Sequence, residues 1–451
     1  MSTTFPESTR RVRRDSWTRL LYLQLGAFAF FLYAFSPSIN LLKDDLHISA
    51  GVAGLHSTGY AVGVTIGGLT APWYIRRAGG SRPALWWGLV GLSLAVGLFC
   101  AVPVLTVTIP AAAICGVFGS WLCIAVPAAL ARAHGPETGP AAITEANAVA
   151  AFVGVAAPLA VGGAAAIGIG WRVALLLVAP LSGVLYLLLG RIREPDWLLP
   201  DVEQVVFEAD LDDVPLAGVG GATAVELKTQ TGTQKDTQVT VPAPRVESPL
   251  GAVPANLPMT TNSLRDLPRR FWLNQVAGVC AGAIEFCLTL WCATLLQDRA
   301  GLSAGAAATG VTAVVAGMAI GRTVGGRLAL RISIDRLIYG SFGTNLLGFA
   351  IFWLGSDAVS MFLGLAVAGL GVALQFPLIS SRGIELSGGQ AELAGAVNMF
   401  GAGIAVGTAP FALGFLSDRV GIHGAYLLLP LFIVVAVAAI AASAARTPAP
   451  A

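Results

Sequence analysis

The chain has 451 residues, of which 55% are hydrophobic and only 12% are charged, and its mean hydropathy is +0.75. Soluble domains carry about 25% charged residues, so this composition excludes an ordinary soluble protein and indicates a membrane protein. The formal net charge of +2 gives no reason to expect nucleic-acid binding.

Apolar runs of about 20 residues, the length that crosses a bilayer as a helix, recur along the chain. Loops and strand edges would leave backbone groups unpaired in lipid, so these runs must be helical. We predict an all-α membrane protein with twelve transmembrane helices in two six-helix bundles. The predicted spans are 20–40, 51–73, 84–102, 105–129, 142–166, 171–190, 271–296, 304–328, 337–355, 358–380, 392–416 and 423–445.

Basic residues are distributed unevenly between the two predicted membrane faces. One face receives the arginines of the N-terminal tail, those of the loop after the second span, and the long polar segment in the middle of the chain. Loops rich in Lys and Arg stay on the cytoplasmic side. We therefore expect a multi-pass protein of the plasma membrane with both termini in the cytoplasm. The other face holds only Lys43, Arg172, Arg299 and Arg419.

The chain divides into five predicted regions. Residues 191–269 are rich in Pro, Asp, Glu, Thr and Gln. They lack the apolar area that would offset chain entropy, so we predict a disordered cytoplasmic linker. The other regions are a basic cytoplasmic tail over 1–19, six-helix bundles over 20–190 and 270–446, and a cytoplasmic tail over 447–451.

The two halves share short motifs in the same order, at a shift of about 250–258 residues. Six spans per half preserve orientation, which predicts parallel repeats related by a pseudo-twofold axis along the membrane normal. The matched stretches are 48–53 with 302–307, 67–71 with 325–329, Pro127 and Arg132 with Pro377 and Arg382, and Asn147 with Asn398.

Three stretches resemble the major facilitator superfamily of transporters, and in particular its actinobacterial members. Residues 317–329 are similar to its eighth span and following loop, Gly170-Trp-Arg172 to the entry of its sixth span, and 67–82 to the loop between spans two and three. The resemblance covers nearly the whole chain apart from the N-terminal tail and the linker. It implies a substrate site between two rocking halves.

The loop over 67–82 departs from the family pattern. Pro72-Trp73 stands where the family has an acidic residue, although the basic residues remain. The resemblance implies a gating role for Arg76, Arg77 and Arg82, with a latch that is weaker than usual or uses other partners.

Glu285 and Arg322 are the charged residues that the predicted spans place well inside the membrane. Such charges are costly and usually face the bundle interior or a water-filled cavity. A small, polar stripe including Gly278, Gly282 and Thr289 runs at helical spacing from Glu285. Low dielectric favours a neutral carboxyl. Glu285 is therefore a candidate proton carrier, neutral when buried and ionised when the cavity opens to water. The competing interpretation is a structural Glu–Arg pair that locks two helices.

The sequence is compatible with three roles for Arg322. These are pairing with Glu285, binding an anionic substrate, and extension of the side chain to the cytoplasmic interface. Some monocarboxylate porters carry a substrate-binding arginine in the eighth span with an aspartate one turn earlier, where this chain has Met318.

The remaining predicted substrate-binding residues are polar or aromatic side chains inside the spans. Trp291 is also a candidate membrane-interface anchor, and Asn398 a candidate interhelical contact. The set is Tyr33, Asn40, Tyr60, Trp121, Trp291, Gln375 and Asn398.

These observations favour a secondary active transporter of a small organic solute, either an organic anion or an amphipathic molecule. We expect alternating access with proton coupling, and broad-specificity drug or metabolite efflux by proton antiport is the alternative. No nucleotide-binding loop or His-Glu-x-x-His motif occurs, so we expect no enzyme activity, catalytic residue, metal or cofactor. A non-transporting sensor or scaffold would tolerate loss of Glu285. The expected partners are the solute, protons and the lipid bilayer, and we expect a monomer that does not bind nucleic acid.

Overall fold

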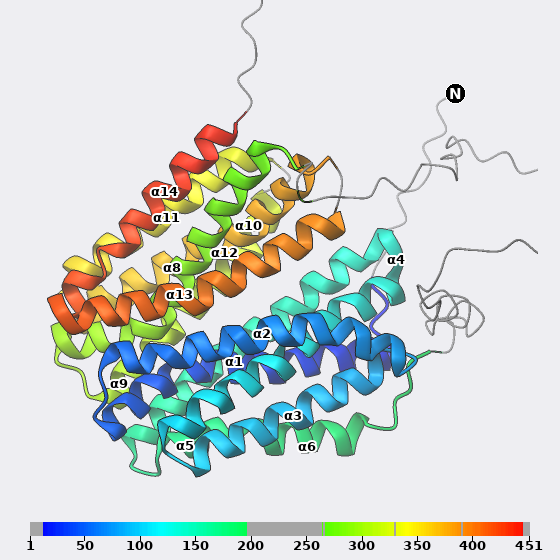
Figure 1. Cartoon of the computed structure of the whole chain (residues 1–451), viewed down its shortest axis with the longest axis horizontal. Coiled ribbons are helices and arrows are strands. Elements are labelled where there is room, and N and C mark those ends of the chain that lie inside the picture. The colour runs from blue at the N-terminus through cyan, green and yellow to red at the C-terminus, as the bar shows by residue number, and fades with distance from the viewer. Residues whose placement is uncertain (1–11, 196–263, 265–266, 329–330, 389–390, 445–451) are drawn as a thin grey trace, which may run out of the picture. The chain divides into compact units, whose positions relative to one another are not determined.

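The computed structural model describes residues 12–195, 264, 267–328, 331–388 and 391–444. Most of the predicted linker and all of the tail over 447–451 lie outside these residues. The described residues form helices and no strand, as the composition and spans predicted. Helices α1 to α6 make up the first bundle, and α8 to α14 make up the second (Figure 1).

Six helical rods form the first bundle. The fourth and fifth rods are continuous in α4, but Gly135 takes a non-helical conformation (φ 66°, ψ −176°) and separates them. The bounds are α1 Ser16–Leu46, α2 Ala50–Arg77, α3 Ser81–Ala101, α4 Leu105–Ala166, α5 Trp171–Leu176 and α6 Val178–Leu189, with α5 and α6 sharing the sixth rod.

The second bundle repeats this order. A short α9 leads directly into α10, and the two helices occupy the position of one predicted span. The bounds are α8 Arg269–Ala300, α9 Ala304–Ala308, α10 Gly310–Leu328, α11 Ile334–Leu354, α12 Ala358–Leu386, α13 Ala391–Ala425 and α14 Leu428–Ser443.

Ten helical stretches among the described residues are long and apolar enough to cross a membrane. The other two predicted spans correspond to α2 and to the shorter α14, so the twelve-helix prediction is confirmed. The helix α2 carries His56, Arg76 and Arg77, which lower its hydropathy. It packs against α13 of the other bundle, so part of its surface meets protein rather than lipid.

Glycine pairs allow the same close helix crossing in both bundles. A Cβ on Gly63 of α2 would lie 1.8 Å from the Ala113 carbonyl oxygen, and one on Gly116 of α4 would lie 2.2 Å from that of Tyr60. Small residues permit such backbone approach where lipid gives helices no hydrophobic reason to associate.

The second bundle builds the matching crossing between α10 and α12. A Cβ on Gly317 would lie 2.1 Å from the Ala366 carbonyl oxygen, and one on Gly369 would lie 2.2 Å from that of Val314. These glycines stand at the repeat shift from Gly63 and Gly116, so the internal repeat seen in sequence is also a repeat of packing.

The boundary between bundle and linker differs from the predicted one. Residues 191–195, assigned to the linker from composition, are described, and Glu194 is buried. Its carboxylate accepts hydrogen bonds from the backbone N–H groups of Ser81 (2.8 Å) and Arg82 (3.0 Å), which begin α3. A polar residue that follows a span directly can thus belong to the bundle as a helix cap.

Replacing Gly63 with alanine is expected to lower thermal stability, because the new methyl group overlaps the Ala113 carbonyl. Overpacking of this kind costs about 1–3 kcal/mol. The matched control is Gly68→Ala in the same helix, where a Cβ meets nothing within 4 Å. The melting temperature in detergent tests this, and equal values for the two variants would contradict the crossing.

Candidate functional site

Glu285 lies near the middle of α8 and is half-buried. On the same helix, Gly282 and Gly278 sit close to neighbouring helices, so that a Cβ on them would lie 3.0 Å from Ala405 of α13 and 3.5 Å from Ile379 of α12. This packing fixes the rotation of α8 and therefore the direction in which Glu285 points.

The structure brings Glu285, Arg322 and Tyr33 together. Glu285 lies within electrostatic range of Arg322 of α10, and both lie within electrostatic range of Tyr33 of α1. Two of these side chains come from the second bundle and one from the first. Among the described residues, no ion pair within 4.0 Å joins Glu285 to Arg322, so the carboxylate is near the guanidinium without being clamped by it.

Gly154 makes room for Tyr33 at this site. A Cβ on Gly154, in the second half of α4, would lie 2.4 Å from Cδ2 of the tyrosine ring. Tyr33 is buried, and its ring packs into the space that the absent side chain leaves. The position of the phenol beside Arg322 therefore depends on a glycine in a different helix.

Two predicted substrate-binding residues lie in helix contacts. The Asn40 side chain donates to the Leu290 carbonyl of α8 and accepts from the Thr294 hydroxyl at 2.8 Å. The Trp291 indole donates to the Pro410 carbonyl at 2.8 Å, and its side chain is fully buried. The polar atoms of both residues are thus engaged by protein, and Trp291 lies in the core rather than at the lipid surface.

Tyr60 and Trp121 lie inside the first bundle. The Tyr60 ring packs against Phe31 and Phe35, with ring centroids 6.2 and 5.6 Å away. Trp121 is half-buried, stacks on Tyr74 with centroids 4.7 Å apart, and donates to the Thr70 hydroxyl at 3.1 Å.

Gln375 and Asn398 lie in the second bundle. Gln375 of α12 is fully buried, and within the described structure both polar atoms of its amide are without a hydrogen-bond partner. Asn398 of α13 is half-buried near Gly383, where a Cβ would also meet Asn274 and Gln275. The amides of Asn274, Gln275 and Asn398 form a polar region of the second bundle around Gly383.

The three predicted gating arginines have different surroundings. Arg76 and Arg77 are exposed, and the Arg77 guanidinium lies 5.6 Å from the centre of the Trp73 ring. Arg82 donates to the carbonyls of Gly190 (2.5 Å) and Ile192 (2.9 Å), which ties α3 to the end of α6 in the same bundle. Within the described part of the chain, none of the three forms an ion pair with the second bundle.

Two charged networks, one around Arg132 and one around Arg382, were not predicted from the sequence. The two arginines occupy matching positions in the internal repeat. Arg132 contacts Glu194 at 3.3 Å, and it also donates to Ser81. The buried Arg382 donates to Asp335 at 2.8 Å and to Asn274 at 3.1 Å. The matching positions of the two arginines in the repeat could have indicated these networks from the sequence.

One Gly-x-Ser-x-Gly sequence, the spacing of a serine nucleophile, occurs from Gly301 to Gly305. Its Ser303 is the N-cap of α9 and accepts a hydrogen bond from the Ala306 backbone N–H at 3.3 Å. That arrangement is a helix cap. Among the described residues, no group of three His, Cys, Asp or Glu side chains is placed to hold a metal ion.

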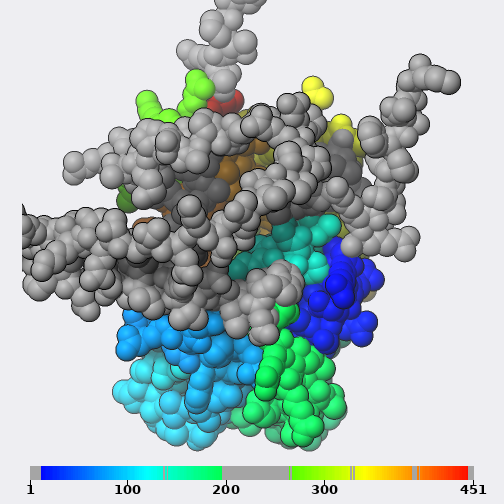
Figure 2. All heavy atoms as spheres, turned by 90° about the vertical axis from the view of Figure 1, so that its right-hand side faces the viewer, coloured from blue at the N-terminus to red at the C-terminus, as the bar shows by residue number. Residues whose placement is uncertain are grey.

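The arginine-rich ends of the helices gather on one face, which we call the basic end. Figure 2 shows this face, where the starts of α1 and α3, the bend of α4 and the end of α6 lie together. We call the opposite end of the helices the distal end.

The two bundles contact each other mainly through the distal halves of their helices. Thr58 of α2 donates to the Gly407 carbonyl of α13 at 2.6 Å, and the Asn40 contact also lies in this half. Towards the basic end the same helices diverge, and Leu69 of α2 and Phe400 of α13 are 77% and 62% exposed (Figure 1). The site of Tyr33, Glu285 and Arg322 therefore lies between bundles that are joined at the distal end.

The model of the Major Facilitator Superfamily matches residues 21–408. The chain belongs to this superfamily. No curated protein matches it significantly. The match extends from α1 into α13, so it includes helices of both bundles and all three residues of the site.

Solved structures share the fold at low sequence identity. A D-xylose–proton symporter is 15% identical with a TM-score of 0.66, covering 96% of this chain and 98% of its own. A bacterial homolog of the human lysosomal transporter Spinster, inward-facing and unoccupied, is 14% identical with the same TM-score and coverage. A single-site variant of the E. coli fucose:proton symporter FucP is 17% identical with a TM-score of 0.55, covering 95% and 98%. The superfamily consists of transporters, and the chain is a multi-pass membrane protein.

Replacing Gly154 with alanine is expected to displace the Tyr33 ring from Arg322. In the proton-coupled transport proposed below, this displacement should reduce solute uptake in proteoliposomes by about tenfold or more. The control is Gly163→Ala in the same helix, where a Cβ has open space. Melting temperatures measured alongside separate displacement from unfolding. Native uptake by a folded Gly154→Ala variant would contradict a role for the Tyr33 position.

Proposed function

We propose that this protein is a proton-coupled secondary active transporter that moves a small organic solute across the plasma membrane by alternating access. The observation that carries the proposal is the meeting of Tyr33 from one bundle with Glu285 and Arg322 from the other. A site made of side chains from both bundles changes its geometry when the bundles rock, which is what coupling between solute and proton requires.

Glu285 is proposed as the proton carrier. A carboxyl in a poorly hydrated cleft is stable as the neutral acid, and contact with water favours the anion. Arg322 lies close enough to stabilise the anion but does not hold it in an ion pair. The carboxyl can therefore take up and release a proton as the cleft alternates between the two aqueous sides.

Arg322 is proposed to bind the acidic group of the solute. A guanidinium presents several donors in a planar fork, which suits a carboxylate. Solute and Glu285 would then compete for one cation, so that binding of an anionic solute and protonation of Glu285 favour each other. Leu69, Phe152 and Phe400 are exposed apolar side chains, and the proposal places them against the apolar part of an amphipathic solute.

Orientation and organisation are also part of this proposal. The arginine content of the basic end favours a cytoplasmic location for it and for both termini. We also propose a cytoplasmic tail over residues 1–19, a cytoplasmic linker within the predicted range 191–269, and a monomer. Efflux of amphipathic drugs or metabolites by proton antiport is the second candidate, favoured by the same exposed apolar side chains. Solute screening in proteoliposomes with an imposed pH gradient and a trapped pH dye tests both directions.

The variant Glu285→Gln is expected to abolish proton-driven accumulation and to retain counterflow exchange of solute. The amide has the shape of the neutral acid but cannot ionise. Glu385→Gln is the control, because Glu385 is exposed at the end of α12. Accumulation against a gradient at the native rate by Glu285→Gln would show that Glu285 is not the carrier.

The variant Arg322→Gln is expected to raise the half-saturation concentration for an anionic solute about 10- to 100-fold, since hydrogen bonds to charged groups contribute about 1.5–3 kcal/mol. Uptake of a neutral analogue should change much less. Equal effects on the two solutes would argue against direct anion binding, and Arg322→Lys tests whether charge alone suffices.

A further inference from the structure

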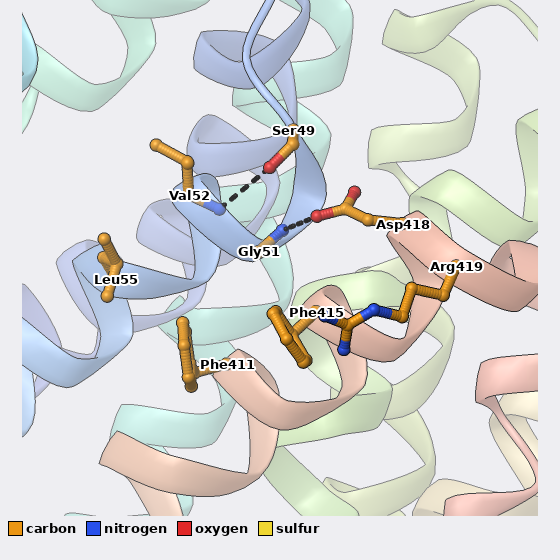
Figure 3. Close-up of a pocket in the computed structure, with 8 residues that line it drawn as sticks. All are labelled: Ser49, Gly51, Val52, Leu55, Phe411, Phe415, Asp418 and Arg419. Carbon is orange, nitrogen blue, oxygen red and sulfur yellow. Dashed lines mark hydrogen bonds between the residues drawn. The ribbon is translucent and has the colours of Figure 1, made fainter.

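The first turn of α2 is capped by a residue of the other bundle. The Asp418 carboxylate of α13 accepts hydrogen bonds from the backbone N–H groups of Ala50 and Gly51, both at 2.8 Å. Figure 3 shows the bond to Gly51. The first N–H groups of a helix have no partner within the helix. The side chain of Ser49, the N-cap of α2, accepts from the backbone N–H of Val52, so the N–H groups of Ala50 and Gly51 depend on Asp418.

Glycines make this contact possible. A Cβ on Gly51 would lie 2.9 Å from Oδ2 of Asp418 and 3.3 Å from the Phe415 backbone, and one on Gly54 would lie 2.9 Å from the Phe411 backbone. The two helices therefore approach to backbone contact here. A cavity of about 310 Å³ beside the contact is lined by Leu55, Phe411 and Phe415 among others.

Arg419, the cation nearest to Asp418 in the chain, does not pair with it. The Arg419 guanidinium lies 3.7 Å from the centre of the Phe415 ring instead. This leaves the Asp418 carboxylate to the α2 N-terminus, whose partial positive charge favours an anion. Among the described residues, it is the one carboxylate that hydrogen-bonds across the two bundles.

We propose that Asp418 is a latch that holds the distal end closed and so sets the balance between the two states of alternating access. When the distal end opens, α2 and α13 separate, and both the carboxylate and the two N–H groups must turn to water. The capping interaction thus exists in one state only. This inference rests on the proposed alternating access, and it assigns Asp418 a positioning role without contact to the solute.

The test measures distances between spin labels by double electron–electron resonance. Labels at Val102 and Val359, exposed at the distal ends of the first and second bundles, report opening of that end. Labels at Leu188 and Ile384, exposed at the basic end, report closing of that end. Five of the six native cysteines are buried and Cys123 is half-buried, so labelling of the native chain sets the background.

In Asp418→Ala the ratio of long to short distal distances should rise about 2- to 30-fold, the range that loss of an N-cap side chain gives. At the basic end, the ratio of short to long distances should rise by the same factor. Asp418→Asn, which keeps an acceptor but loses the charge, should shift both populations less. Gly51→Ala, which forces the carboxylate away, should also favour the open distal end.

Asp357→Ala is the matched control. Asp357 caps α12 at the same end of the molecule, but it accepts from Ser360 of its own helix at 3.0 Å. Losing this cap should lower stability without moving either distance population. A native distance distribution in Asp418→Ala and Asp418→Asn would overturn the latch, as would an equal shift in Asp357→Ala.

Solute uptake by the same preparations separates this inference from the proposed function. Proton-driven uptake with distances that do not respond to Asp418 would leave the transporter proposal standing and reject the latch. Distances that respond to Asp418 without any proton-driven uptake would support the latch and reject the proposed coupling.

Discussion

Hydrocarbon offers no hydrogen-bond partner, so every polar group that the bilayer surrounds must find its partner within the chain. This constraint governs the whole structure. Helices satisfy their own backbones, and the remaining polar groups are those of helix ends and of side chains inside the bundles. The partners of these groups determine which helices are joined. In this protein most partners lie in helix caps, in interhelical hydrogen bonds and in one cluster between the bundles, while the Gln375 amide is an exception among the described residues.

Helix ends show how the constraint becomes architecture. Glu194 caps α3 and binds Arg132, which closes the first bundle at the basic end. Asp418 caps α2 from the opposite bundle at the distal end. Both are carboxylates at helix N-termini, but Glu194 joins elements of a single bundle, whereas Asp418 joins two bundles whose helices diverge elsewhere. Only the second kind of contact bears on motion between the bundles.

The central site has the opposite character. Glu285, Arg322 and Tyr33 are neighbours, but among the described residues no ion pair within 4.0 Å fixes the carboxylate. A carboxylate in a close ion pair is held in its charged form, so it is difficult to protonate. A carboxyl that is close to a cation without being bound to it has two accessible protonation states, which is the property that the proposed coupling needs. The surrounding glycines, including Gly154 and Gly282, hold the helices close enough to form this site.

The sequence by itself determined the class, the twelve spans and the internal repeat, because hydropathy and the absence of charge depend only on local composition. It also identified Glu285, Arg322 and Tyr33 as candidate site residues, since a charged or polar residue inside an apolar span can be recognised from the sequence. Only the tertiary structure decided that these three meet, that Asn40 and Trp291 are engaged in helix contacts, and that Glu194 belongs to a bundle rather than to the linker. Those facts depend on helix rotation and on close approach at glycines, which are set by contacts between residues far apart in the chain and leave no local pattern.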